Sequence, residues 1–158
     1  MITTADLKRI TSQPGYAAEG EYTAVKNKGG RPRKVKTSSE HLEQVKLFAW
    51  ANSGEAQETY PQLAYLFAIP NGGARHPAVG FKLKREGVKP GILDIFLPVA
   101  RGGFHGLFVE MKYGSNWLSK EQDRWVGILH DQGYSVAVCK SSDEAKQAIV
   151  DYLEGRTR

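Results

Sequence analysis

Two apolar segments separated by a Gly-rich turn constrain the fold of this chain more than any other feature. Residues 92–99 and 107–113 are rich in Ile, Leu, Val and Phe, and Arg101-Gly102-Gly103 lies between them. Such a pattern is typical of two antiparallel strands joined by a tight turn. Because apolar residues occupy both faces of each segment, we expect the pair at the centre of a sheet.

Three charged residues interrupt these apolar segments. With Gly102 at the centre of the hairpin, Asp94 lies across from Glu110, and the alternation of side chains places Lys112 on the same face. A slip of one residue would separate the three side chains, and the turn sequence alone does not fix the register. The hairpin therefore predicts, for one register, a cluster of two carboxylates and one amine.

Two carboxylates that face each other among apolar residues repel and lose hydration unless a cation lies between them. Mg²⁺ or Mn²⁺ fits this position, because hard cations prefer carboxylate oxygens and retain water ligands. Such an ion can hold a phosphate and lower the pKa of a bound water, while Lys112 orients that water or stabilises charge on the phosphate. The alternative is a salt-bridge cluster that serves only stability. Desolvation usually outweighs the gain from such a cluster, which favours the functional interpretation.

The rest of the chain predicts helices and strands around this hairpin. Thr37 and Glu40 have capping-box spacing, which predicts a helix that ends near Ala51 and whose main apolar stripe is Leu42, Val45 and Ala49. The other expected elements are a buried strand over 65–69, a helix over 77–86, a helix from a Ser119–Gln122 capping box to about Gln132, a strand over 134–139 and a helix capped by Ser142. A strand–helix–strand unit implies a parallel pair, so we expect a mixed sheet flanked by helices.

The positive charge of the chain is concentrated near its N-terminus. Residues 1–38 carry eight Lys or Arg and three acidic residues, whereas the remainder carries fourteen of each. We expect a basic, largely disordered arm over 1–37 and a folded domain over 38–155. The arm indicates a polyanionic partner such as nucleic acid, and a solvated tail is the alternative. The single Cys139 and the lack of a long apolar run predict a cytoplasmic protein without a membrane span. We expect the cell to be that of a bacterium or of a virus-infected host.

Two groups of residues are candidates for contact with DNA. Within the arm, Arg31, Arg33 and Lys34 belong to a Gly-Arg-Pro-Arg-Lys run that resembles the core of an AT-hook. A second group precedes the acidic strand and comprises Asn71, Arg75, His76, Lys82, Lys84, Arg85 and Lys89. These cations could hold phosphates on either side of a cut, although a solvated helix face is equally consistent with them. We interpret Trp117, Trp125 and Phe81 as core or interface residues rather than as platforms for bases.

The ordered series of motifs resembles the VRR-NUC branch of the PD-(D/E)XK nuclease superfamily. The series consists of Glu43 in the first helix, Pro70-Asn71-Gly72-Gly73, Gly91-Ile92-Leu93-Asp94, Val109-Glu110-Met111-Lys112, Leu118-Ser119-x-x-Gln122-x-x-Trp125 and Gly133-Tyr134-x-Val136. Leu93 stands where the name of the superfamily implies Pro, but the acidic residue after it is retained. The resemblance implies an α/β fold with a restriction-endonuclease-like core, in which helices flank a mixed central sheet.

The resemblance also implies roles for individual residues. Asp94 and Glu110 would bind the metal ion, the backbone carbonyl of Met111 would add a ligand, and Glu43 would approach the ion directly or through water. A partly exposed helix residue is the alternative for Glu43, which lies on a second apolar strip between Leu47 and Trp50. Gln122 would help to place the site or touch DNA, or it would serve only in its capping box.

The activity that the resemblance implies is Mg²⁺- or Mn²⁺-dependent cleavage of DNA. A homodimer that cuts branched DNA, such as a four-way junction, is the expected form, because two cuts on opposed strands need two active sites. The alternatives are a sequence-specific restriction-type nuclease, a flap nuclease, an RNA nuclease and a DNA-binding module without catalysis.

Overall fold

The computed structural model describes residues 39–70 and 77–157. In chain order the elements are α2 (Ser39–Ala51), α3 (Gly54–Thr59), the 3₁₀ helix η1 (Pro61–Tyr65), β1 (Phe67–Ala68), α4 (Pro77–Arg85), β2 (Ile95–Leu97), β3 (Leu107–Met111), α5 (Lys120–Asp131), β4 (Ser135–Cys139) and α6 (Ser142–Leu153). The predicted helix start at Thr37 and the basic arm lie outside the described residues. None of the described helices is both long enough and apolar enough to cross a membrane.

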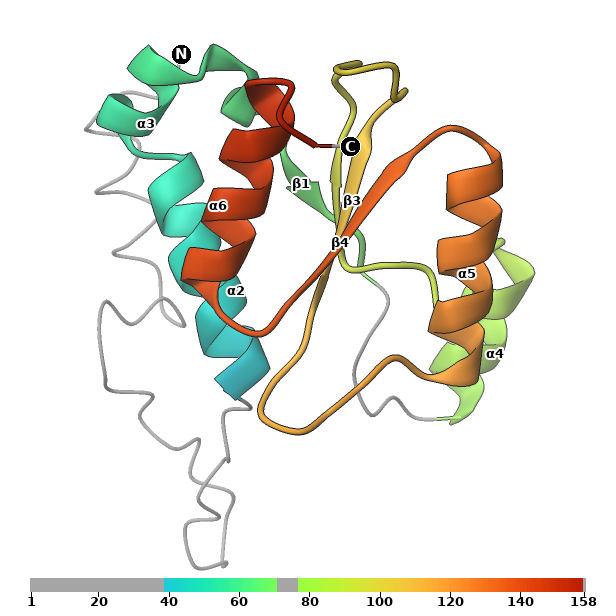
Figure 1. Ribbon diagram of the computed structural model, residues 1–158. Helices are drawn as coiled ribbons and strands as arrows, with labels where there is room; N and C mark the ends of the chain where they lie inside the picture. The colour runs from blue at the N-terminus through green and yellow to red at the C-terminus, as the bar shows by residue number, and fades with distance from the viewer. Residues whose placement is uncertain (1–38, 71–76, 158) are drawn as a thin grey trace, which may run out of the picture. The chain divides into compact units, whose positions relative to one another are not determined.

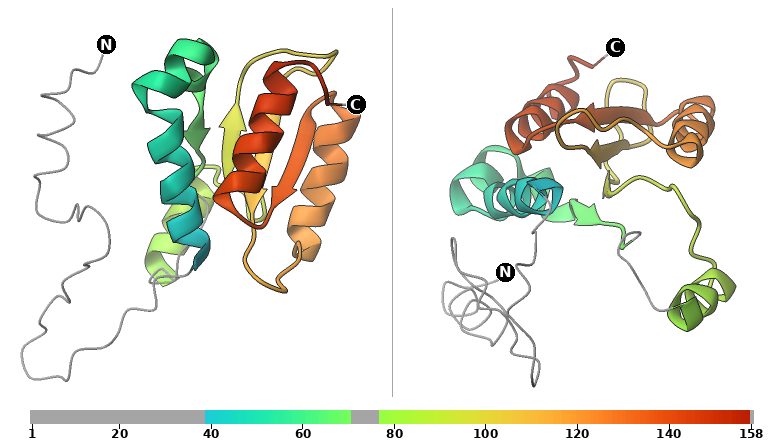
Figure 2. Two further views of the ribbon diagram at one scale, coloured as in Figure 1. Left: turned by 60° about the vertical axis from the view of Figure 1, so that its left-hand side comes forward. Right: turned by 90° about the horizontal axis from the view of Figure 1, so that it is seen from below.

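A four-stranded mixed sheet forms the centre of the fold. Its order is β1-β2-β3-β4, and β3 pairs with β2 in antiparallel and with β4 in parallel orientation. Helices α2 and α6 cover one face of the sheet and α5 covers the other (Figure 1, Figure 2). The predicted mixed sheet flanked by helices is confirmed. The parallel β3–β4 pair follows from the α5 crossover, as expected for a strand–helix–strand unit.

The register of the β2–β3 hairpin agrees with the predicted one. Phe96 pairs with Phe108, and Ile95 pairs with Val109. The turn is a two-residue loop, Gly102-Gly103, whose positive φ angles of 57° and 89° favour glycine. It is closed by a bridge between Arg101 and Phe104. Regular antiparallel pairing continued from this bridge would place Phe96 opposite Val109, whereas Phe96 pairs with Phe108. The segment between β2 and the turn therefore contains one residue more than the segment between the turn and β3.

Side chains alternate between the two cores of the domain along β3. Val109 and Met111 face α2 and α6, where they join a core that includes Leu47, Ile149 and Tyr152. Phe108 points to the opposite face, where it packs with Leu93 and Leu129 beneath α5. On that face the rings of Phe96 and Phe108 stack with their centroids 4.3 Å apart. Glu110 follows the same alternation as Phe108, which directs a carboxylate toward α5.

The buried face of α2 is not the predicted one. Leu42 and Val45 are 44% and 47% exposed, and Ala49 is exposed as well. The core instead takes Leu47 and Ala51, with Phe48 and Trp50 packed against it. Both strips have helical spacing, so the choice between them depends on which one meets the sheet and α6.

Two smaller expectations were also wrong. The predicted strand over 65–69 is only the two-residue edge strand β1, and both of its residues are exposed rather than buried. The last helix is capped by Ser141, whose hydroxyl accepts the Glu144 N–H, and not by Ser142. The predicted end of the α4 region is confirmed, because Gly87 follows that helix with a φ of 94°.

Candidate active site

Asp94 lies immediately before β2, at the end of the hairpin remote from the turn. Its backbone carbonyl accepts the Ile69 N–H at 2.7 Å. Its carboxylate oxygen Oδ2 accepts the backbone N–H of Met111 at 3.2 Å. The side chain of Asp94 thus fastens the end of β3 where Glu110 and Met111 lie. This contact places the two acidic residues side by side on the α5 face, as the register requires.

Glu110 is almost completely buried and is held through only one of its two oxygens. Oε1 accepts a hydrogen bond from Lys112 Nζ at 2.6 Å, and it also accepts one from the side-chain amide of Gln122. Oε2 is buried and has no hydrogen-bond partner among the described residues. A buried acceptor without a partner costs free energy, and a cation or water bound at Oε2 would remove that cost.

Gln122 joins the acidic cluster to α5. Its side-chain oxygen accepts the Ser119 N–H at 2.9 Å, while the Ser119 hydroxyl accepts the Gln122 N–H at 3.2 Å. The predicted capping box is therefore confirmed. Since the amide nitrogen of the same side chain donates to Glu110, one residue both starts the helix and orients the carboxylate. The two roles that the sequence left open are compatible.

Burial raises the pKa of both carboxyl groups. For Glu110, burial and the charge of Asp94 outweigh the hydrogen bond from Lys112 and raise the pKa from 4.5 to about 7. For Asp94, burial raises the pKa against the hydrogen bond from Met111 and the charge of Lys112. A pair that resists carrying two negative charges without a cation is what a metal site of this kind requires.

The raised pKa of Glu110 predicts that the metal-free protein loses stability as the pH rises from about 4.5 to above 7. Over that range the folded protein holds a proton on Glu110 that the unfolded chain has released, so raising the pH favours unfolding. The melting temperature in EDTA, measured from pH 5 to pH 8, should fall across the range, and the fall should be smaller in Glu110→Gln. Equal slopes for the two proteins would contradict the assignment.

The residues at this site fit a hard divalent cation. Asp94, Glu110 and the carbonyl oxygen of Met111 offer oxygen donors only, and Oε2 of Glu110 has no other partner. Within the described part of the chain, no group of three or more His, Cys, Asp or Glu side chains is placed to hold a metal ion. Further ligands would come from water or from a substrate phosphate, which is usual for Mg²⁺.

Glu43 is not brought into this cluster. Its carboxylate accepts the backbone N–H of Ser142 at 2.7 Å and pairs with Lys46 Nζ at 2.7 Å. These hydrogen bonds lower its pKa to about 2. Glu43 therefore joins α2 to the first turn of α6, where a negative charge is favourable. Its predicted approach to the ion stays a prediction.

The α6 contact of Glu43 predicts a loss of stability in Glu43→Ala of about 1 kcal/mol, the usual cost of losing a helix cap. Lys46→Ala is the matched control, because it removes the ion pair and leaves the acceptor for Ser142 in place. Urea denaturation should separate the two variants. A variant Glu43→Ala with unchanged stability and a much higher Mg²⁺ requirement for cleavage would instead support the predicted role at the ion.

The predicted DNA-binding residues are only partly described. Arg31, Arg33, Lys34, Asn71, Arg75 and His76 lie outside the described residues. Lys82, Lys84 and Arg85 are exposed on α4, and Lys89 is exposed on the segment that leads to Asp94. Lys82 Nζ lies 3.7 Å from the carboxylate of Glu86.

Two of the aromatic residues interpreted as core or interface residues lie outside the core, namely Trp117 and Phe81, and Phe81 is 66% exposed. Trp117, interpreted above as a core or interface residue, is 76% exposed. It lies on the loop between Lys112 and Ser119, and the ammonium group of Lys140 lies 4.6 Å from the centroid of its ring. Its position in the connecting segment between β3 and α5 was the available signal, because such loops run over the protein surface.

The sheet order, the hairpin register and the cluster of Asp94, Glu110 and Lys112 define a restriction-endonuclease-like core of the PD-(D/E)XK class. The chain belongs to the VRR-NUC domain family, whose family model matches residues 37–143. It is a member of a nuclease domain family on this ground.

Two similar proteins agree with this assignment. The chain is 36% identical over 73 residues to a Fanconi-associated nuclease 1 homolog of Oryza sativa subsp. japonica. That match covers 46% of this chain and only 8% of the rice protein. A solved structure of a VRR_NUC domain protein superposes with a TM-score of 0.59 at 27% identity, over 73% of this chain and 88% of the other.

Proposed function

We propose that this chain is a divalent-metal-dependent nuclease that hydrolyses phosphodiester bonds in branched DNA as a homodimer. The observation that carries the proposal is the buried Oε2 of Glu110, which has no hydrogen-bond partner in the described structure and belongs to a carboxyl group whose pKa the charge of Asp94 helps to raise. Membership of the VRR-NUC family supports a nuclease. The choice of branched DNA and the homodimer are our proposals.

Several residues have separate roles at this site. When bound, Mg²⁺ or Mn²⁺ would supply a Lewis acid that holds the scissile phosphate and lowers the pKa of the attacking water. Gln122 and Lys112 fix Oε1 of Glu110 and leave Oε2 for the ion. Lys112 Nζ lies 2.6 Å from Oε1 of Glu110, so it is suited to stabilise negative charge that develops on a phosphate at this site.

Exposed cations support a nucleic acid as the substrate. The side chains of Lys82, Lys84, Arg85 and Lys89 lie in the segment that runs into the acidic strand, and none is buried. Such cations bind backbone phosphates and release counterions, so binding should weaken as the salt concentration rises. They carry no preference for a branch or for a base sequence.

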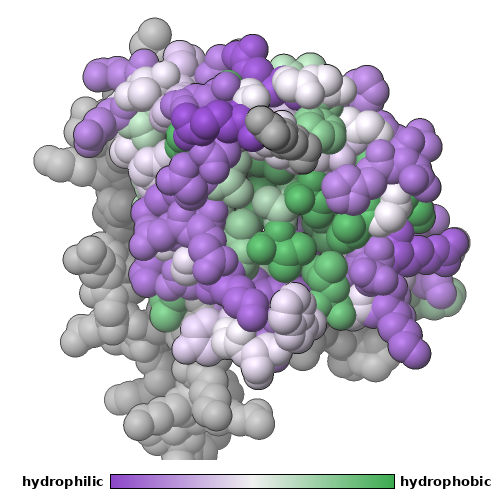
Figure 3. Space-filling model, in the orientation of Figure 1, coloured by the Kyte–Doolittle hydropathy of each residue, from purple (hydrophilic) through white to green (hydrophobic). Residues whose placement is uncertain are grey.

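A second copy of the chain is the proposed partner. Apolar side chains gather over β4 between α6 and α5 (Figure 3). On β4, which is an edge of the sheet, Val138 is 39% exposed. Exposed apolar edge strands are favourable sites for association. If sedimentation shows a monomer on a four-way junction, and only one strand is nicked, the homodimer proposal fails.

The experiment that tests the proposed function compares wild type with Glu110→Gln on a labelled panel, in Mg²⁺, in Mn²⁺ and in EDTA. The panel contains a four-way junction, a flap, a linear duplex, single-stranded DNA and RNA. Metal-dependent cutting of branched DNA that is lost in Glu110→Gln supports the proposal. Cutting at one short duplex sequence, or of RNA, would reassign the substrate. Tight binding without cutting in either metal would leave a DNA-binding protein on a nuclease fold.

A further inference from the structure

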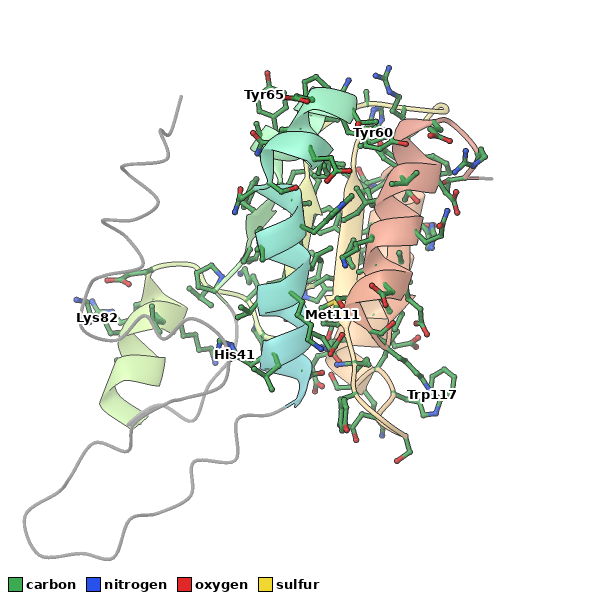
Figure 4. The ribbon with its side chains drawn as sticks, turned by 90° about the vertical axis from the view of Figure 1, so that its left-hand side faces the viewer. His41, Tyr60, Tyr65, Lys82, Met111 and Trp117 are labelled. Carbon is green, nitrogen blue, oxygen red and sulfur yellow. The ribbon has the colours of Figure 1, made fainter. Side chains whose placement is uncertain are left out.

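The loop between β3 and α5 carries two exposed aromatic side chains next to the candidate active site. Trp117 is 76% exposed and Tyr113 is 51% exposed. Among the large apolar residues of the described chain, Trp117 has the highest exposure. Figure 4 shows its indole ring projecting away from the domain. A single exposed aromatic residue is common on protein surfaces, so a function for Trp117 needs a second observation.

The second observation is the cation that accompanies the ring. Lys140 Nζ lies 4.6 Å from the centroid of the Trp117 ring, within the range of a cation–π contact. The backbone of Lys140 is itself held, because its N–H donates to Glu144 Oε2 at 2.7 Å. The contact restrains the ring while leaving most of Trp117 accessible. An aromatic ring next to an ammonium group is suited to bind one nucleotide, because the base stacks on the ring and the phosphate pairs with the ammonium group.

The position of this pair ties it to the cluster around Glu110. Trp117 lies between Lys112 and Gln122, both of which donate hydrogen bonds to Glu110. Lys140 directly follows β4, and the carbonyl of the preceding Cys139 accepts the Lys112 N–H at 2.8 Å. Both residues therefore lie at the carboxyl ends of the parallel strands β3 and β4, the edge of a sheet at which ligands usually bind.

We infer that Trp117 and Lys140 form a stacking site for an unpaired base of the DNA substrate, beside the cleavage site; the inference rests on the proposed function. Within a regular duplex both faces of every base are covered by its neighbours. Only a base that is unpaired, at a flap, a loop, a branch point or in a single strand, offers a free face to the indole ring. Trp117 thus supplies a preference for unpaired DNA that the exposed lysines of α4 do not supply.

The test measures DNA binding in EDTA, so that no strand is cut. Wild type, Trp117→Ala and Trp117→Phe are titrated by fluorescence anisotropy against a labelled oligothymidine, an abasic strand of the same length and a blunt duplex. Trp117→Ala should weaken binding to oligothymidine about 10-fold or more, in line with the contribution of one stacked base. Trp117→Phe should retain most of the affinity. Binding to the abasic strand and to the duplex should change by less than about twofold in both Trp117 variants, because the abasic strand has no bases and the duplex exposes base faces only at its two ends.

Three outcomes would overturn the inference. They are an unchanged affinity of Trp117→Ala for oligothymidine, an equal loss on all three ligands, and a Trp117→Phe protein as weak as Trp117→Ala. Because Trp117 is exposed, neither substitution removes a core contact. Lys140→Ala is a useful companion, since it should weaken binding to oligothymidine and to the abasic strand alike through the lost charge.

The cleavage panel separates failure of this inference from failure of the proposed function. Metal-dependent cutting that is lost in Glu110→Gln but is the same in Trp117→Ala on every substrate would overturn only the stacking site. Binding that depends on Trp117 without cutting in any metal would overturn the nuclease and retain the stacking site.

Discussion

Replacing Glu110 by Gln should lower the rate of metal-dependent cleavage by about a thousandfold or more, because a ligand of a catalytic cation contributes several kcal/mol to stabilising the transition state. The amide keeps the shape of the side chain and an oxygen that can accept the hydrogen bonds of Lys112 and Gln122. It removes the negative charge that Oε2 would offer to the ion. The loss should therefore appear in catalysis and not in folding.

The folded state of Glu110→Gln should be at least as stable as wild type in EDTA at pH 8. At that pH the wild-type carboxylate is ionised, although burial and Asp94 raise its pKa to about 7. The amide avoids this cost. Single-turnover cleavage and thermal unfolding of the same preparations give the two readouts. Glu58→Gln, on the exposed surface of α3, is the matched control. Cleavage by Glu110→Gln at the wild-type rate would contradict the assignment of the site.

Replacing Gly91 by Ala should destabilise the fold by about 2–5 kcal/mol, through backbone strain and overpacking together. Gly91 has a φ of +78°, which L residues with side chains rarely adopt. An added Cβ would lie 2.5 Å from Glu121 Cβ and 2.8 Å from the Glu121 backbone carbon. The chain can relieve this overlap only by moving the first turn of α5 away from the segment that leads to Asp94.

That movement should also lower activity, because the first turn of α5 carries Gln122, which donates to Glu110. Gly155→Ala is the matched control. Gly155 has a similar φ of +71°, but an added Cβ would have no neighbour within 4 Å, so only the strain of about 1 kcal/mol remains. Urea denaturation and cleavage rates of both variants test the prediction. Equal losses in the two would show that the contact with α5 has no role.

The functional cluster was largely predictable from the sequence because strand alternation is a strict rule. Once Phe96 pairs with Phe108, the side chains of Asp94, Glu110 and Lys112 must share one face. The register itself was not predictable. The observed turn, Gly102-Gly103, would by itself shift the ladder by one residue. One extra residue near Val99 restores the observed pairing, and the Val99 N–H there donates to the Leu97 carbonyl at 2.9 Å.

Other features depended on contacts between segments far apart in the chain. Two apolar strips on α2 were candidates for the core, and packing against the sheet and α6 selected the one with Leu47 and Ala51. The carboxylate of Glu43 accepts the Ser142 N–H in the first turn of α6 because α2 and α6 pack together on one face of the sheet (Figure 1). Trp117 is likewise exposed because no element of the described chain packs over its side chain.

The sequence by itself determined the order of the helices and strands other than α3 and η1, the Gly-rich hairpin, the Ser119–Gln122 capping box and the identity of the acidic cluster. These follow from local rules that act over a few residues, such as apolar periodicity, capping and alternation. Only the tertiary structure decided the hairpin register, the buried face of α2, the partner of Glu43 and the free oxygen of Glu110. Each of these features depends on contacts between segments far apart in the chain. Local sequence patterns do not contain the free energy of those contacts.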